Sequence, residues 1–189
     1  MTTGFDAPTT AIDDITGDYT LDVSHSRLGF VARHAMVTKV RGQFDQFEGT
    51  ARTQAGLTDA AIEVTAQVAS IDTRNADRDG HLRAGDFFDA EQFPTLTFRS
   101  TEVTAADDET MRVAGDLTIK GVTKPVTIDF EFGGVAKDPF GNERIGFDGS
   151  TTINRKDFGM EFNAALETGG VLVADKVTLE IEISAIKNA

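Results

Sequence analysis

The chain has 189 residues, which suits a single domain large enough to bury a substantial core. It carries 31 acidic residues against 18 Lys and Arg, a formal net charge of −13, so its average surface repels nucleic acid and anionic membranes. We therefore expect no nucleic-acid partner. The absence of cysteine excludes disulfides, thiolate metal sites and cysteine nucleophiles.

The start of the chain differs in composition from the rest. Residues 1–17 are rich in Gly, Pro, Thr and Asp and read as an N-terminal tail or lid, in which residues 11–15 form at most a helical turn. Residues 18–189 read as the folded domain. The basic and apolar regions of a secretory signal are missing, so a cytoplasmic location is expected. No apolar run approaches the roughly 18 residues of a membrane span, so we expect no integral membrane segment.

Alternation of apolar and polar residues predicts about eight antiparallel strands with mostly short connections. In chain order the alternating stretches are residues 19–32, 38–53, 62–68, 96–103, 113–119, 126–132, 145–153 and 177–183. A change of phase within residues 38–53 predicts a β-bulge. Lys120 and Gly121 mark the clearest hairpin, and Asp138 to Asn142 a further turn. The pattern fits a barrel or a sandwich and does not choose between them.

The aromatic residues are unevenly chosen: 14 Phe, one Tyr and no Trp. Phe gives a purely apolar surface without a polar group that needs a partner, which suits an apolar lining. Composition alone favours the plainer interpretation, an ordinary β core that uses Phe. Small residues at inward phases would leave room for the tail of a ligand; they are Gly42, Gly49, Ala66, Gly115 and Gly149.

A helical connector from Arg78 to Pro94 interrupts the strands and carries the pair Phe87 and Phe88. Because adjacent helical residues point about 100° apart, we expect only one of the two rings to face the interior and the other to pack on the wall. Together with residues 22–26 (DVSHS), 115–123 (GDLTIKGVT) and 154–160 (NRKDFGM), this segment resembles the YceI-like family of lipid- or polyisoprenoid-binding proteins. The resemblance runs from about Tyr19 to Lys187.

The resemblance implies an all-β fold with short helical insertions, an extended eight-stranded antiparallel lipocalin-like β-barrel with an apolar central cavity. It implies a long-chain ligand, such as a polyisoprenoid, an isoprenoid quinone or a fatty-acid-like lipid. From the residues themselves we expect no catalysis and no cofactor other than the bound lipid. The residues expected to contact the lipid tail are Phe30, Met36, Phe44, Phe87, Phe88, Phe98, Phe130, Phe147, Phe158 and Met160.

Cations beside apolar positions are candidates for holding a phosphate or polar head group. The candidates are Arg33, His34, Asn154 and Arg155. Surface ion pairs with neighbours such as Asp157 explain the two arginines at least as well.

The segment from Asn75 to Asp86 comes close to a calcium-binding loop. It departs from the pattern at position 1, which is Asn, and at position 12, where the shorter Asp replaces a bidentate Glu. The plainer interpretation is that Asp77 or Asp79 caps a short helix containing His81 to Phe88. The three histidines lack zinc-ligand spacing, so no metal site is expected.

No nucleophile elbow or phosphate-binding loop is present. Asp157-Phe158-Gly159 matches the magnesium-binding tripeptide of protein kinases, but the other kinase motifs are absent, so it does not indicate a kinase. Two alternatives to a carrier remain. One is an enzyme or stress-response factor acting on an uncharged small molecule, with His34 and a carboxylate such as Asp157 as acid and base. The other is a filled barrel that serves as a dimeric interaction module. A homodimer is compatible with the carrier as well.

Overall fold

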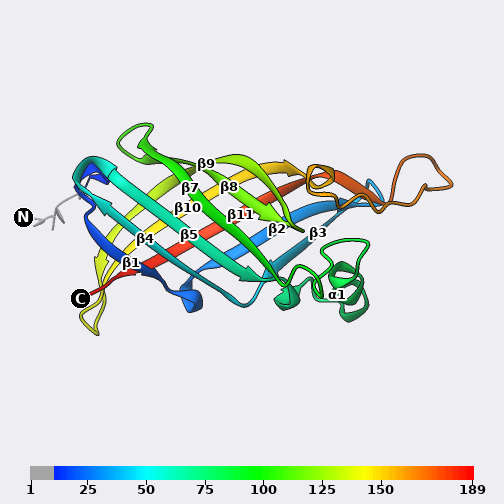
Figure 1. The fold of residues 1–189 in the computed structure, drawn as a ribbon, viewed down its shortest axis with the longest axis horizontal. Coiled ribbons are helices and arrows are strands. Elements are labelled where there is room, and N and C mark those ends of the chain that lie inside the picture. The colour runs from blue at the N-terminus through cyan, green and yellow to red at the C-terminus, as the bar shows by residue number, and fades with distance from the viewer. Residues whose placement is uncertain (1–10) are drawn as a thin grey trace, which may run out of the picture.

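The computed structural model describes residues 11–189, which form one sheet wrapped into an elongated barrel (Figure 1). Its strands are β1 (Gly17–Leu21), β2 (Arg27–His34), β3 (Thr38–Phe44), β4 (Phe47–Gln54), β5 (Thr58–Gln67), β6 (Ile71–Asp72), β7 (Thr95–Ala105), β8 (Thr110–Ile119), β9 (Val122–Lys137), β10 (Glu143–Asn154) and β11 (Val173–Lys187). The helices are α1 (Ala76–Arg83) and the short 3-10 turns η1 (Ile12–Asp14), η2 (Val23–His25), η3 (Ala55–Leu57), η4 (Val68–Ser70) and η5 (Arg155–Phe158). None of the helices within residues 11–189 is both long and apolar enough to cross a bilayer.

The barrel closes through β1, which pairs with two strands far apart in the sequence. Tyr19 lies opposite Ala51 of β4 on one side and Lys187 of β11 on the other. β1 and β2 together form one interrupted strand beside β11, and β3 and β4 form another. With β5 and β7 to β11 these make a closed eight-strand antiparallel barrel, and the predicted fold class is confirmed.

The predicted bulge between residues 38 and 53 is wrong. Asp45 and Gln46 break this stretch into β3, which pairs with β2 and β6, and β4, which pairs with β1 and β5. The amide of Asp45 donates to the carbonyl of Ser70 (3.1 Å), and the amide of Gln46 donates to the Ser70 hydroxyl (3.0 Å). The phase changes because the strand changes partners there.

The hairpin predicted around Lys120 and Gly121 is confirmed. Ile119 of β8 lies opposite Val122 of β9, and the two turn residues have φ angles of 52° and 74°. Two successive positive φ angles match the twist of the flanking strands, as in a type I′ turn. The ammonium of Lys120 donates to the carbonyl of Gly85 (2.9 Å), which ties this turn to the segment after α1.

Arg144 of β10 joins the β9–β10 turn to the end of β1. Its guanidinium pairs with Asp22 and, at 2.8 Å, with Asp138. The hydrogen bonds from Arg144 and then Ser24 hold the pKa of Asp22 well below its usual range. Burial alone would raise the pKa of Asp138, but hydrogen bonds from Arg144, Asn142 and the Phe140 amide lower it to about 2.

The pairing of Arg144 with Asp22 and Asp138 predicts that the stability of the protein depends on pH in the acid range. Both aspartates take up protons on unfolding between pH ~4 and ~2, so the free energy of unfolding falls as the pH is lowered through this window. Arg144→Met removes the donors that depress both pKa values and flattens that dependence. Urea titrations across the pH range measure it.

The matched control is Arg99→Met, which removes an exposed pair with Glu63 (3.2 Å) and leaves the pH dependence unchanged, since exposed pairs contribute little. Equal slopes in all three proteins would contradict the role given to Arg144.

Candidate ligand-binding cavity

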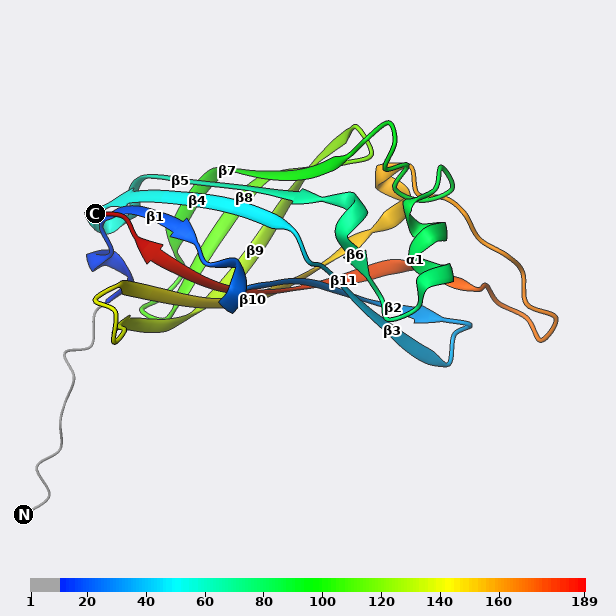
Figure 2. The same ribbon diagram turned by 90° about the horizontal axis from the view of Figure 1, so that it is seen from below.

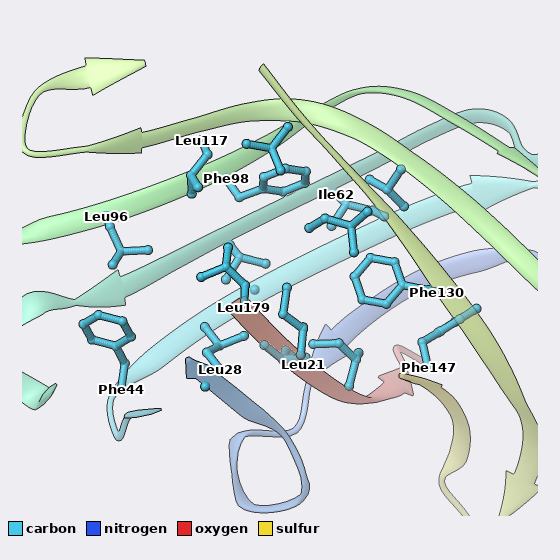
Figure 3. Close-up of a pocket in the computed structure, with 18 of the residues that line it drawn as sticks. Leu21, Leu28, Phe44, Ile62, Leu96, Phe98, Leu117, Phe130, Phe147 and Leu179 are labelled. Carbon is cyan, nitrogen blue, oxygen red and sulfur yellow. The ribbon is translucent and has the colours of Figure 1, made fainter. Parts of the chain in front are cut away.

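An elongated apolar cavity of about 280 Å³ lies inside the barrel. Its lining reaches from Ile15 at the end that carries η1 to Arg155 and Met160 at the end that carries η5. In Figure 3, side chains from opposite walls, such as Ile62 and Leu179, point into the same interior. The interior therefore differs from the filled barrel that one alternative predicted.

The strand periodicity explains why the lining is apolar. On β11 the residues Val177, Leu179, Ile181 and Ile183 all line the cavity, as predicted, while the residues between them face outward. The same alternation on β5 brings Ala60, Ile62 and Val64 to the inner face of the barrel. Aliphatic side chains thus form much of the cavity lining, although the predicted tail-binding residues were nearly all Phe. The alternation of apolar and polar residues along these strands is the sequence signal that identifies them.

Three aromatic rings lie over glycines on the neighbouring strand. The pairs are Phe30 with Gly42, Phe98 with Gly115 and Phe130 with Gly149. A Cβ atom at Gly149 would lie 2.6 Å from Cδ1 of Phe130, and one at Gly42 would collide with the Phe30 ring. The prediction that these three glycines leave room for a ligand was wrong, because the Phe rings occupy the space beside each glycine. The absence of a side chain at these glycines lets the rings lie against the neighbouring strand. Of the other small residues predicted to leave room, Gly49 lines the cavity and Ala66 is fully buried.

One end of the barrel is closed by η1 and η3. Ile12, Ile15 and Leu57 are almost fully buried there, and Ile15 and Leu57 line the cavity. The hydroxyl of Tyr19 donates to the carbonyl of Thr16 (3.1 Å), and burial, with the charge of Glu143, raises its pKa. Residues 11–17 lie at this end of the barrel, and residues 1–10 of the predicted tail or lid lie outside the described residues.

The opposite end carries α1, which begins differently from the prediction. Asn75 is the N-cap: its side-chain oxygen accepts from the amide of Arg78 (3.0 Å). Asp79, predicted as a cap, is instead buried and accepts from the amide of Thr73 (2.8 Å) and from its hydroxyl. Asp77 lies in the first helical turn. Polar groups of the calcium-like segment are thus used in local hydrogen bonds.

Phe87 and Phe88 follow the helix, since α1 ends at Arg83. Both line the cavity, so the expectation that only one ring faces it was wrong. The reason is that the 100° spacing of a helix does not apply to the turn in which they lie. The Phe87 ring packs 5.4 Å from that of Phe162, and the Phe88 ring packs 5.8 Å from that of Phe44.

Most residues predicted to contact a lipid tail do line the cavity; they are Phe30, Phe44, Phe87, Phe88, Phe98, Phe130, Phe147 and Met160. Two do not. Met36 is 59% exposed at the tip of the β2–β3 hairpin, because it lies beyond the last paired residues of these strands. Phe158 is 1% exposed and packs in a core cluster with Leu117 and Ile119, because the η5 turn directs it into the wall.

Among the head-group candidates, Arg155 alone borders the cavity. It is 3% exposed, and its guanidinium donates to the carbonyls of Ala174 (2.8 Å), Met160 (2.6 Å) and Val173 (3.2 Å). Burial lowers its pKa, but an arginine still stays charged. Its carboxylate neighbour is Asp175 at 3.7 Å, and not Asp157 as the surface-pair interpretation supposed.

The other three candidates lie away from the cavity lining. Arg33 and His34 are exposed at the end of β2, and Asn154 caps η5 by accepting from the amide of Lys156 (3.0 Å). His34 and Asp157 lie on separate elements, and no hydrogen bond or ion pair joins them within residues 11–189. In the same part of the chain no three His, Asp or Glu side chains gather closely enough to hold a metal ion.

Comparisons with known proteins agree with this geometry. The family model of the YceI-like domain matches residues 19–185. A UPF0312 protein of Staphylococcus aureus (strain N315) is 42% identical over 167 residues, which cover 86% of this chain and 94% of the relative. The crystal structure of BcnA from Burkholderia cenocepacia superposes with a TM-score of 0.73 at 26% identity, over 87% of this chain and 98% of that one. A polyisoprenoid-binding domain from Saccharophagus degradans, implicated in plant cell wall breakdown, has the same fold, with a TM-score of 0.70 at 19% identity over 90% of this chain and 98% of that one.

The ring over Gly42 provides a test of how the bore is kept open. Gly42→Ala pushes the Phe30 ring off the wall and into the cavity, so we expect about tenfold weaker binding of a long-chain probe such as a fluorescent fatty acid. Adding Phe30→Leu to this variant removes the clash and restores binding.

Gly85→Ala is the control, because a Cβ there meets nothing within 4 Å. Full binding by Gly42→Ala, with an unchanged melting temperature, would contradict the arrangement.

Proposed function

Because the chain belongs to the YceI-like domain family, we propose that it binds and carries a long-chain amphiphile in its barrel, such as a polyisoprenoid, an isoprenoid quinone or a fatty-acid-like lipid. The observation that carries the proposal is the elongated cavity, whose lining is almost wholly apolar. Such an interior favours an apolar chain through burial and offers no polar array for a sugar or nucleotide. The name of the Saccharophagus degradans domain, which has the same fold, supports the ligand class.

The energetics favour a long tail. Each buried methylene contributes ~0.8 kcal/mol, so about a dozen buried carbons give about 10 kcal/mol before the cost of ordering the ligand and the protein is subtracted. A longer tail adds to this gain with each further carbon that it buries. A short ligand of a few carbons leaves too little to offset the ordering cost, so chain length is the first determinant of selection.

The two ends of the cavity give the ligand a direction. The end covered by Ile12 and Ile15 is apolar and closed, whereas the opposite end holds the buried cation Arg155. We place the tail toward the closed end and the head group toward Arg155. Its guanidinium has five donors, and three are used on backbone carbonyls, which leaves donors for a phosphate or carbonyl oxygen.

The carrier proposal includes the absence of catalysis. The acid and base of the enzymatic alternative, His34 and Asp157, both face solvent on separate elements. Neither borders the cavity. A binding role uses the enclosed apolar surface directly, and this favours it over the alternative.

Native mass spectrometry of the purified protein, followed by organic extraction of what it holds, tests the proposal. After delipidation, the protein should take up geranylgeraniol, decyl-ubiquinone or palmitate in a 1:1 ratio, and at least one of these should raise its melting temperature. Failure to bind any of the three, together with no co-purified lipid, would overturn the carrier function.

A blocked cavity gives a sharper prediction. Val64 lines the cavity on β5, so Val64→Trp fills the bore and should lower retention of the co-purified lipid at least tenfold. The matched control is Thr65→Trp on the same strand, which faces outward and should retain lipid as the unaltered protein does. Mass spectrometry of both variants, after circular dichroism has shown that they fold, measures the difference. Equal retention would place the ligand outside the barrel.

A further inference from the structure

The end of the barrel near Arg155 exposes apolar side chains. Met36 is 59% exposed, Val37 76% and Val171 40%. The amide of Ala35 donates to the carbonyl of Leu172 (2.7 Å), and Met36 packs over Gly170, so the β2–β3 hairpin and the following loop form one surface. We call residues 33–39 and 170–172 the hairpin end. Figures 1 and 2 both place it at the end of the barrel that also carries α1, away from the C-terminus.

The same hairpin is basic in an acidic chain. Residues 23–44 contain no Asp or Glu, although the chain has 31 acidic residues. The cations of this segment are Arg27, Arg33, Lys39 and Arg41. Arg27 and Arg41 both pair with Glu180, at 3.3 and 3.6 Å. Arg33 and Lys39 pair with no carboxylate among residues 11–189, so the hairpin end keeps a net positive charge.

Arg33 and Lys39 also lie directly opposite each other. Their Cα atoms are partners in the β2–β3 ladder, and both residues are exposed. Like charges in directly opposed positions destabilise a strand pair. The protein therefore carries a local electrostatic cost that an external anionic group would offset.

Protection of a sheet edge explains only part of this arrangement. β3 pairs with β6 only at Gln43 and Phe44, and Lys39 lies on the part of β3 whose second edge has no partner strand within residues 11–189. Charged residues commonly protect such edges from pairing with another chain. Arg33 lies on β2, which is paired on both sides, so its charge protects no edge. Met36 and Val37 are exposed and apolar, and apolar side chains do not protect an edge from pairing with another chain.

We propose that the hairpin end docks on an anionic phospholipid bilayer. Met36, Val37 and Val171 enter the headgroup region, while Arg33 and Lys39 contact lipid phosphates. The rest of the chain, with its net charge of −13, is repelled by the same surface, so docking is oriented and reversible. In this orientation the Arg155 end of the cavity faces the lipid. Docking itself does not require a bound ligand. The role that we give to docking, the passage of a lipid ligand between the bilayer and the cavity, rests on the proposed function.

Vesicle sedimentation tests the docking. We expect binding to phosphatidylcholine vesicles that contain about a third phosphatidylglycerol, and little binding to phosphatidylcholine alone. Arg33→Gln with Lys39→Gln removes two charges, at about fivefold each, so binding should fall about 25-fold. Because the opposed charges are gone, this variant should melt at the same temperature as the unaltered protein or above it. The control, Arg99→Gln with Lys137→Gln, changes the net charge equally at exposed positions elsewhere and should leave binding within twofold.

Two single variants test the apolar tip and the sign of the charge effect. Val37→Ser should weaken vesicle binding several-fold, whereas Phe140→Ser should not, although Phe140 is 89% exposed in the β9–β10 turn. Glu167 is an exposed acid in the loop that ends at Val171. Glu167→Gln removes repulsion from the bilayer and should strengthen binding about fivefold.

The outcomes separate docking from carriage. Val64→Trp should dock normally while losing its lipid. A protein that retains lipid but binds both vesicle types equally, or whose two double variants behave alike, overturns the docking proposal and leaves the carrier function standing. A protein that docks as described but holds no lipid supports the docking and removes the carrier function.

Discussion

The structure depends on the pairing of β1 with both β4 and β11, which closes the sheet on itself. Closure gives every strand of the wall an inside and an outside, so the alternation along each strand sorts apolar side chains inward at all depths. A bounded apolar interior follows from this one constraint. Opening it would expose that lining to water and would remove the cavity together with much of the core.

The cavity persists because of how the wall handles large rings. Phe30, Phe98 and Phe130 each lie across a glycine of the adjacent strand, so their bulk is directed along the wall. An eight-strand barrel has a bore that side chains can fill completely. Pairing a ring with a glycine keeps the surface apolar and continuous while the centre stays open, which is the property that a long tail requires.

The two ends of the barrel differ in chemistry. At one end, η1 and η3 bury apolar residues and close the cavity. At the other end, a buried arginine borders the cavity beside a hairpin that is both basic and apolar at its tip. The chain has a net charge of −13, so a negatively charged partner repels most of its surface and attracts the basic hairpin.

The sequence by itself determined the strand positions, the Lys120–Gly121 turn, the inward face of β11 and the apolar character of the interior, because periodicity and turn chemistry are local. The resemblance carried by short motifs added the barrel and the expectation of a long-chain ligand. Only the tertiary structure decided that β3 and β4 separate, that Phe87 and Phe88 both reach the cavity, and that Met36 lies outside it. Each of these depends on which distant strand or turn a residue meets. The change of phase within residues 38–53 marks where the partners change, but local spacing does not identify the partners.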